Sequence, residues 1–350
     1  MKKFTVALLY NLKASAPHAA NDEPWDKWNE LDSERTVAGI ERALRAGGHE
    51  VIALEGDVTL PQKLERHQVD IAFNTCEGFR GGSREAQVPV ILDALGIPYT
   101  GSGVMTLALA LDKAMTKRVM AFYGLPVPAG QTFISGDERI DARLKYPLFI
   151  KPSREGSGMG VSAKSVVRDA RELRDQVKHI IKAYEGPALA EEFIEGREFT
   201  LGMLGNLTAD ERFPRNGNWK AASLRVFPPL EVDLSPCPPE EAGLYTSVIK
   251  GKLYEVPKYL CPAPISKTMR AKMERYAIGA FAALECFDFA RVDFRIRADT
   301  NQPYILEINP LAGLQEGISD IVMQAEADGV NYIALINGIL DAAAKRAGLM

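Results

Sequence analysis

The chain has 350 residues, a length that predicts two or three domains. Hydrophobic residues make up 46% and charged residues 25%, a globular composition that excludes a disordered or fibrous protein. The formal net charge of −4 provides no basic field for a nucleic-acid partner. The four cysteines lack CxxC spacing and the four histidines lack HxH or HExxH spacing, which argues against a structural zinc site and a disulfide scaffold.

The first apolar segment, residues 4–10, has two interpretations. A basic start before it and small residues at 14–16 resemble a secretory signal. However, the segment is only seven residues long, and the polar residues Asn11 and Lys13 follow it closely. A buried strand of a parallel sheet has the same pattern, and we prefer this interpretation. No run approaches the ~18 apolar residues of a membrane span, so we expect a cytoplasmic protein without a membrane partner.

The first hundred residues alternate between strand and helix patterns. We expect strands at 4–10, 51–54, 71–74 and 97–99, and helices at 31–45 and 85–95. This order, with short connections, predicts a parallel sheet covered by helices. Residues 11–30 lack periodicity and contain Trp25 and Trp28, so we expect a loop near a functional edge.

The rest of the chain predicts strands and helices around one unusual segment. The expected helices are 106–123, 169–184, 266–284 and 332–346, and the expected strands are 131–133, 147–151, 189–193, 198–204, 289–297 and 304–309. Residues 226–264 contain eight of the chain's 21 prolines, so regular structure is not expected there. Long ordered loops of this kind are usually lids or binding loops.

A glycine-rich segment follows Lys151 at the end of a predicted strand. Gly156, Gly158 and Gly160 allow the backbone to approach a ligand closely, with N–H groups free to face phosphate oxygens. The segment is neither a Walker A loop, because GK[ST] is absent, nor a GxGxxG fingerprint, which would open a helix. A strand–loop–strand arrangement is typical of a flap over a nucleotide; an ordinary glycine-rich hairpin is the alternative.

Two late strands place polar side chains opposite each other. Glu307 and Asn309 lie on one side of their strand, with Leu306 on the other side. A turn centred on residues 299–301 would pair Asp293 with Glu307, and the same register would pair Arg291 with Asn309.

Two directly opposed carboxylates repel one another unless a divalent cation lies between them. Mg²⁺ prefers such carboxylates together with substrate phosphates, so Asp293 and Glu307 favour a magnesium site. The alternative is a solvated sheet face whose charges are neutralised by Arg291 and Arg295. A third segment, residues 191–198, could offer backbone groups to a flat base and a carboxylate to a ribose, although exposed charges explain it equally well.

Together these segments resemble the ATP-grasp superfamily and, within it, the D-alanine–D-alanine ligase group. The matching segments are GIPYTGSG (96–103), LDK (111–113), KPSREGSGMG (151–160), EEFIEGRE (191–198), RVD (291–293) and EIN (307–309). They occur in the family's order and cover most of the chain. The resemblance implies an α/β ATP-grasp fold with three domains: an N-terminal parallel α/β domain (1–108), a central domain with the glycine-rich flap (109–190), and a C-terminal domain with an antiparallel sheet, the metal site and the 226–264 loop (191–350).

The resemblance also implies roles for individual residues. The residues expected to bind ATP are Lys113, Lys151, Gly156, Gly158, Gly160, Glu191, Phe193, Ile194, Glu198 and Lys250. The residues expected to bind two Mg²⁺ ions, with Mn²⁺ as the alternative metal, are Asp293, Glu307 and Asn309. The expected catalytic set is Glu34 (anchor of the first ammonium group), Ser157 (orientation of that acid and its lid), and Arg291 and the Gly313 N–H (oxyanion).

The implied reaction joins two amino-acid substrates. A carboxylate attacks the γ-phosphate to give an acyl phosphate and ADP, and an amine then displaces phosphate to form an amide. Such chemistry needs positioning and charge neutralisation rather than a protein nucleophile, together with a lid that excludes water. The family further implies a homodimer and a role in cell-wall precursor synthesis.

The departures from the family pattern all lie on the acceptor side. Residues 11–30 replace a glycine-rich turn, residues 74–78 replace a His-Gly stretch, Lys250-Gly251 replaces Lys-Tyr, and Ile318-Ser319 falls where a Ser-Leu pair holds the second alanine. We therefore expect an intact ATP half and an altered specificity. The alternatives are a ligase for another amino acid or dipeptide pair, a phosphotransferase that stops at the acyl phosphate, and a nucleotide-binding pseudoenzyme, against which the metal-ligand set argues.

Overall fold

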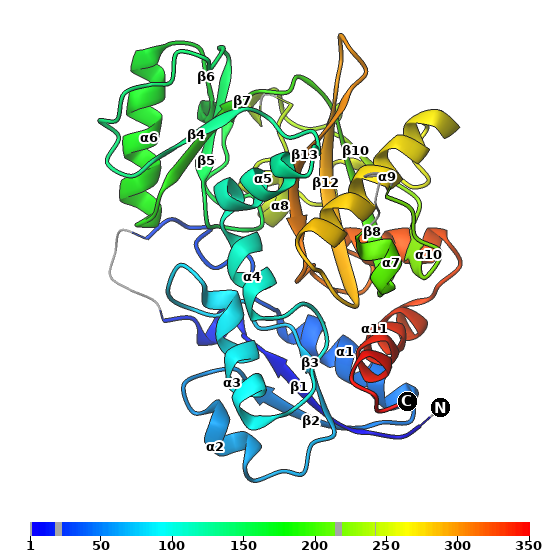
Figure 1. Cartoon of the computed structure of the whole chain (residues 1–350). Helices are drawn as coiled ribbons and strands as arrows, with labels where there is room; N and C mark the ends of the chain where they lie inside the picture. The colour runs from blue at the N-terminus through cyan, green and yellow to red at the C-terminus, as the bar shows by residue number, and fades with distance from the viewer. Residues whose placement is uncertain (1, 18–22, 214–218, 242) are drawn as a thin grey trace.

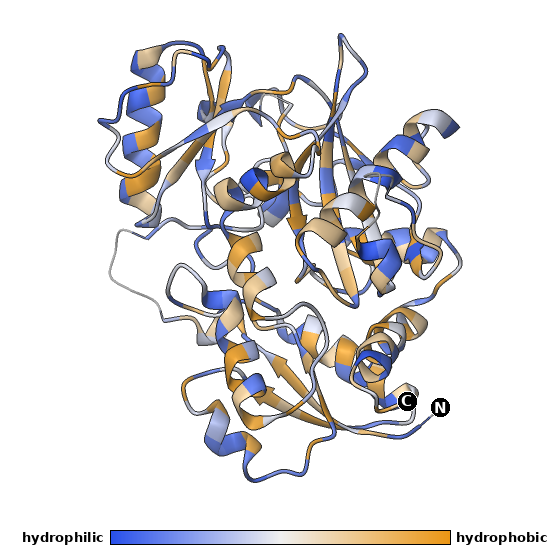
Figure 2. Ribbon diagram, viewed as in Figure 1, coloured by the Kyte–Doolittle hydropathy of each residue, from blue (hydrophilic) through white to orange (hydrophobic). Residues whose placement is uncertain are grey.

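The computed structural model describes residues 2–17, 23–213, 219–241 and 243–350, and these residues form three β-sheets flanked by helices (Figure 1). The first sheet is parallel, in the order β2 (Glu50–Glu55), β1 (Thr5–Tyr10), β3 (Ile71–Asn74). Figure 2 shows these strands in mainly apolar colours, as expected for a sheet covered on both faces. The parallel sheet is confirmed, but the strand expected at 97–99 is reduced to a single bridge between Ala72 and Tyr99.

Helices from both ends of the chain cover this sheet. The helices near it are α1 (Glu34–Ala46), α2 (Leu60–Leu64), α3 (Gln87–Leu95) and α11 (Tyr332–Arg346). Ser33 begins α1 by accepting a hydrogen bond from the Thr36 N–H. Ile40 of α1 and Leu340 of α11 belong to one core with the residues of β1. The two ends of the chain therefore lie close together, and Lys2 donates to the Leu349 carbonyl at 2.9 Å (Figure 1).

The second sheet carries the glycine-rich flap. Its antiparallel strands run in the order β4 (Gly130–Phe133), β7 (Ala188–Glu192), β5 (Leu148–Pro152), β6 (Val166–Val167). Helix α6 (Ala170–Tyr184) begins with an Asp169 cap and packs Leu173, Val177 and Ile180 against the sheet. The flap connects β5 to β6, so both ends of the flap are anchored in the sheet.

The third sheet is larger and antiparallel. Its strands run β11 (Lys258–Leu260), β10 (Leu230–Asp233), β8 (Gly196–Gly205), β12 (Phe289–Arg297), β13 (Pro303–Asn309), and β9 (Leu224–Val226) also pairs with β8. The helices of this region are α7 (Ala209–Arg212), α9 (Lys267–Ala283) and α10 (Asp320–Ala327). The predicted register is confirmed, with Asp293 opposite Glu307 and Arg291 opposite Asn309.

A bulge in this ladder corrects one expectation. Phe294 pairs with Ile305 whereas Asp293 pairs with Glu307, so Leu306 is the extra residue on β13. The alternation in the sequence placed Leu306 on the side away from Glu307. Because the bulge interrupts the alternation, Leu306 and Glu307 line the same cavity.

The helix expected at 106–123 is divided in two. It forms α4 (Val104–Leu111) and α5 (Lys113–Phe122), separated by Asp112 in an extended conformation. The Asp112 carboxylate caps α5 by accepting hydrogen bonds from the Ala114 and Met115 N–H groups. The break places Lys113 in the first turn of a new helix rather than within a continuous one.

The expectation of an irregular 226–264 segment is also wrong in part. The segment contains β10, α8 (Ser247–Lys252) and β11. Its prolines, such as Pro229 and Pro262, lie in the connections, where a missing N–H breaks no ladder. Among the described residues, no helix has both the length and the apolar character needed to cross a membrane.

Candidate active site

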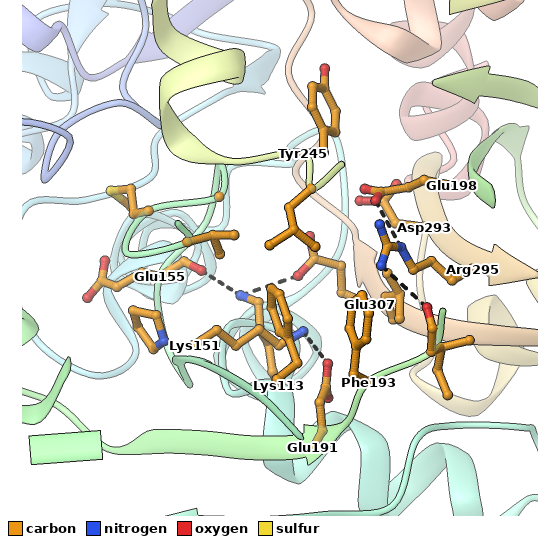
Figure 3. Close-up of a pocket in the computed structure, with 18 of the residues that line it drawn as sticks. Lys113, Lys151, Glu155, Glu191, Phe193, Glu198, Tyr245, Asp293, Arg295 and Glu307 are labelled. Carbon is orange, nitrogen blue, oxygen red and sulfur yellow. Dashed lines mark hydrogen bonds and ion pairs between the residues drawn. The ribbon is translucent and has the colours of Figure 1, made fainter. Parts of the chain in front are cut away.

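A cavity of about 90 Å³, here called the hinge pocket, lies between the second and third sheets. The predicted ATP residues that line it are Lys113, Lys151, Gly158, Glu191, Phe193, Ile194, Glu198 and Lys250. Asp293 and Glu307 line it as well, and Figure 3 shows these side chains converging from different elements. Segments that are distant in the sequence therefore meet at this cavity.

The walls of the hinge pocket are apolar. The rings of Phe149 and Phe193 stack with centroids 6.0 Å apart, and Met159 and Leu306 add further apolar surface. Such walls suit a flat aromatic group. Of these four residues only Phe193 is expected from the sequence, because isolated apolar residues cannot be distinguished from core residues by pattern alone.

Arg295 supports the Phe193 side of the pocket. Its guanidinium lies 5.2 Å from the centroid of the Phe193 ring and donates to Glu198 at 3.2 Å and to the Ile194 carbonyl at 3.3 Å (Figure 3). The sequence pattern suggests Arg295 only as a charge neutraliser on a sheet face. In the structure it holds together three residues predicted to contact the nucleotide.

Lysines on the opposite side are held by one buried carboxylate. The Glu191 carboxylate lies 2.8 Å from Lys151 Nζ (Figure 3). It also lies 3.1 Å from Lys117 Nζ. Burial opposes the charge on Lys151, but the carboxylates of Glu191 and Glu307 outweigh it and raise the pKa of Lys151. The pocket therefore presents a lysine that is charged at neutral pH.

Lys113 joins the flap to the sheet edge. Its Nζ donates to the Glu155 carbonyl at 2.5 Å and lies 3.4 Å from Glu307 Oε2 (Figure 3). Burial alone would raise the pKa of Glu307, but nearby cations, Lys113 and Lys151 foremost, hold it well below its ordinary value. Glu307 is therefore a carboxylate at neutral pH.

The oxygen donors at this edge suit a hard divalent cation. The Asp293 carboxylate accepts hydrogen bonds from Arg291 at 2.8 and 2.9 Å, from Thr200 at 2.7 Å and from Asn309 at 3.1 Å. Across the part of the chain that the structure describes, Glu307 accepts no hydrogen bond, and no three His, Cys, Asp or Glu residues are placed to hold a metal alone. Two carboxylates and an amide oxygen fit Mg²⁺ when substrate phosphates complete its shell.

A second cavity of about 500 Å³, here called the polar pocket, adjoins the hinge pocket. Lys113 and Lys250 line both cavities. The other predicted residues that line the polar pocket are Gly156, Ser157, Arg291, Asn309 and Gly313.

Two predicted residues lie outside both linings. Glu34 is exposed at the start of α1, although its neighbours Ser33 and Arg35 line the polar pocket. Gly160 instead donates its N–H to Asp26 at 3.1 Å. The structure therefore does not bring Glu34 to the other predicted catalytic residues.

The polar pocket also contains acidic residues that sequence reasoning missed: Glu30, Glu77, Glu85 and Asp320. Glu30 pairs with Arg84 at 2.5 Å, with both side chains buried. Only one of these residues lies in a segment that the sequence analysis singled out: Glu77 belongs to residues 74–78, which depart from the family pattern.

Residues 23–30 contact the flap directly. The Gly156 N–H donates to Glu30 at 3.1 Å, and Asp26 accepts from Gly160 and, at 2.8 Å, from the Tyr184 hydroxyl. Trp25 packs under Lys252 of α8, with Nζ 3.9 Å from the ring centroid. This part of the segment 11–30 thus lies at the pocket, while residues 18–22 of that segment lie outside the described residues.

The three-sheet fold and the flap over a lysine-lined and carboxylate-lined cavity define a protein of the ATP-grasp class. The chain superimposes on the crystal structure of D-alanine–D-alanine ligase from Bacillus anthracis complexed with ATP, with a TM-score of 0.70, 18% identity and 99% coverage of both chains. At this identity the likeness establishes the fold.

Sequence comparisons give the family. Residues 120–216 and 240–341 match the model of the D-Ala–D-Ala ligase C-terminus, which is more than half of the chain. D-alanine–D-alanine ligase of Paracidovorax citrulli is 33% identical, over 86% of this chain and 83% of the relative. The uncharacterised protein y4sG of Sinorhizobium fredii is also 33% identical, over 94% and 92% of the two chains. The chain belongs to the D-alanine–D-alanine ligase family and is a ligase of that type.

Proposed function

We propose that the chain is an ATP-dependent carboxylate–amine ligase that joins two amino acids through an acyl phosphate. The observation that carries this proposal is the continuity of the two pockets. The hinge pocket has apolar walls and cations, and it shares Lys113 and Lys250 with a polar pocket of about 500 Å³. Nucleotide and substrates can therefore meet at one edge of the third sheet.

The hinge pocket is the proposed nucleotide site. Its apolar walls suit adenine, Glu198 suits the ribose, and Lys113 and Lys151 suit the phosphates. Asp293, Glu307 and Asn309 would hold Mg²⁺, which when bound neutralises charge on the transferring phosphoryl group. The related enzyme of Bacillus anthracis was crystallised with ATP, which supports this assignment.

Two displacements make up the proposed reaction. The carboxylate oxygen of the first substrate bonds to the γ-phosphorus, and the bond from that phosphorus to the β,γ-bridging oxygen breaks to release ADP. The amine nitrogen of the second substrate then bonds to the acyl carbon, phosphate leaves and the nitrogen loses a proton. Arg291 and the Gly313 N–H line the polar pocket and would stabilise the oxyanion, while the flap around Ser157 would exclude water.

The first substrates to consider are two molecules of D-alanine, because the curated relatives carry that name. The altered acceptor segments and the acidic polar pocket favour a different amino acid or dipeptide as the alternative. From the family resemblance we also propose a homodimer and domain boundaries near residues 108 and 190.

Phosphate release with Mg²⁺-ATP, measured over D- and L-amino acids singly and in pairs, tests the function. Mass spectrometry would identify the product. We expect amino-acid-dependent release of phosphate and ADP, and loss of both in Lys151→Ala and Glu307→Ala at unchanged circular dichroism. ATP hydrolysis that no amino acid or dipeptide stimulates would contradict the proposal.

A further inference from the structure

Two glutamates in the polar pocket form no hydrogen bond and no salt bridge with the residues that the structure describes. Glu77 and Glu85 both line this cavity, and Glu85 is only 9% exposed. Within the described ranges, neither carboxylate has a hydrogen-bond or salt-bridge partner. An unpaired polar group that is buried and borders a cavity is costly unless a ligand satisfies it.

The nearest cation is already committed to other residues. Arg84 pairs with Glu30 at 2.5 Å and with Glu155 at 3.1 Å, and it donates to the Arg154 carbonyl at 2.9 Å. These hydrogen bonds use four of its five N–H groups, and none of them reaches Glu77 or Glu85. Burial, reinforced by the Glu30 carboxylate, raises the pKa of Glu85 to about 8, and burial next to Glu85 raises the pKa of Glu77 well above its ordinary value. The pKa of about 8 keeps Glu85 protonated at neutral pH until a cation binds beside it.

We propose that Glu77 and Glu85 form the subsite that binds an ammonium group of the amino-acid substrate. An ammonium has three N–H donors and one positive charge, which matches two acceptor groups that lack donors. The proposal rests on the ligase function and deepens it by assigning substrate recognition. Glu34, which the family resemblance assigns to this role, is exposed and does not line the pocket.

Other ligands fit the subsite less well. A negatively charged group would be repelled by the Glu30 carboxylate and would offer Glu77 and Glu85 no N–H donor. The ammonium belongs either to the α-amino group or to a basic side chain of the substrate, and the experiment distinguishes these two sources.

The test compares Glu77→Gln and Glu85→Gln with the wild type and with Glu65→Gln, an exposed control in the same region. Lysine and norleucine, as D and L isomers, have side chains of similar length but differ in the side-chain ammonium. Phosphate release gives the KM for the amino acid and for ATP. Calorimetric titration of the same amino acids, with a non-hydrolysable ATP analogue present, gives binding without turnover.

We expect either glutamine variant to raise the amino-acid KM or Kd at least tenfold, with the KM for ATP within twofold of wild type. Glu65→Gln should change neither value. If the affinity falls only for lysine, the subsite binds the side-chain ammonium. If the affinity falls equally for lysine and norleucine, the subsite binds the α-ammonium. Glu85→Asp retains the charge and should bind more tightly than Glu85→Gln, which separates recognition from misfolding.

The two hypotheses can fail separately. Turnover with unchanged amino-acid KM in both glutamine variants would overturn the subsite and leave the ligase function intact. If no amino acid supports turnover by the wild type, the proposed ligase function is wrong. Calorimetric binding then tests the Glu77–Glu85 subsite independently. Binding that is lost in Glu85→Gln would support it, whereas absent or unaltered binding would overturn it.

Discussion

The two adjoining pockets differ in how their charged and titratable side chains are paired. In the hinge pocket several charges are paired, since Glu191 lies between Lys117 and Lys151 and Glu307 faces Lys113. In the polar pocket Glu77 and Glu85 are left unmatched. Paired charges are organised before a ligand arrives, whereas buried carboxyl groups without partners depend on a ligand to satisfy them.

Among the changes that test this comparison, removing the charge of Glu307 should have the largest effect on activity. Glu307→Gln should lower ADP formation by roughly 100-fold or more, because charge neutralisation at the transferring phosphoryl group is lost. Stopped-flow or coupled measurement of ADP, together with a thermal melt, checks this. Glu50→Gln, at an exposed position of β2, is the control. Equal activity of the two variants would remove Glu307 from the site.

The buried Glu30–Arg84 pair should give the next largest effect. Its side chains are 6% and 7% exposed, so Glu30→Ala leaves a buried, partly unpaired guanidinium and should cost about 3 kcal/mol of unfolding free energy. Urea denaturation measures the loss. The matched control is Glu41→Ala, which removes an exposed pair with Arg45 and should cost less than about 0.5 kcal/mol. Similar losses of unfolding free energy in the two variants would contradict the expectation that the buried pair contributes more to stability than the exposed pair.

The pH dependence of stability tests whether the unpaired Glu85 of the polar pocket is protonated in the folded protein. The pKa of Glu85 is raised from 4.5 to about 8 in the folded protein, so the folded state binds the proton more tightly than the unfolded state. The unfolding free energy of the ligand-free protein should therefore fall as pH rises from 4.5 to about 8, by at most about 1.4 kcal/mol per unit. Glu85→Gln should flatten this slope in urea denaturation at pH 5, 6.5 and 8. An unchanged slope would show that Glu85 is ionised in the folded protein.

The smallest effect should come from Lys252, which lies over Trp25 at the rim of the polar pocket. Because this contact is partly exposed, Lys252→Met should lower the unfolding free energy by no more than about 1 kcal/mol and should shift the tryptophan emission. Lys267→Met, at an exposed position in the first turn of α9, is the control for a lost surface charge. An identical emission spectrum in Lys252→Met would mean that Trp25 is not covered in solution.

Part of the hinge pocket could be predicted from local patterns, whereas its ATP-binding residues were expected from the family resemblance. The alternation in β12 and β13 and the intervening turn were sufficient to pair Asp293 with Glu307. The position of Leu306 was not predictable, since a single-residue bulge leaves no mark in the alternation. The break at Asp112 was hidden for a similar reason, because apolar residues continue on both sides of it.

The acidic residues of the polar pocket could not be predicted, because they meet only through tertiary packing. Glu30 precedes α1, Glu77 follows β3 and Glu85 lies just before α3, and nothing in their spacing brings them together. Glu34 illustrates the opposite problem. A matching motif placed it in the catalytic set, but its local position at the start of α1 leaves its side chain exposed.

The position of α11 has a consequence for how the polypeptide folds during its synthesis. Leu335, Ile336, Ile339 and Leu340 complete the core around β1 and α1, although roughly three hundred residues separate the two parts of this core. The N-terminal sheet can form earlier, but α1 covers only part of one apolar face until residues 332–346 have left the ribosome. A nascent chain of this protein should therefore be protected by chaperones for most of its translation, and its first domain should be the last to become resistant to proteases.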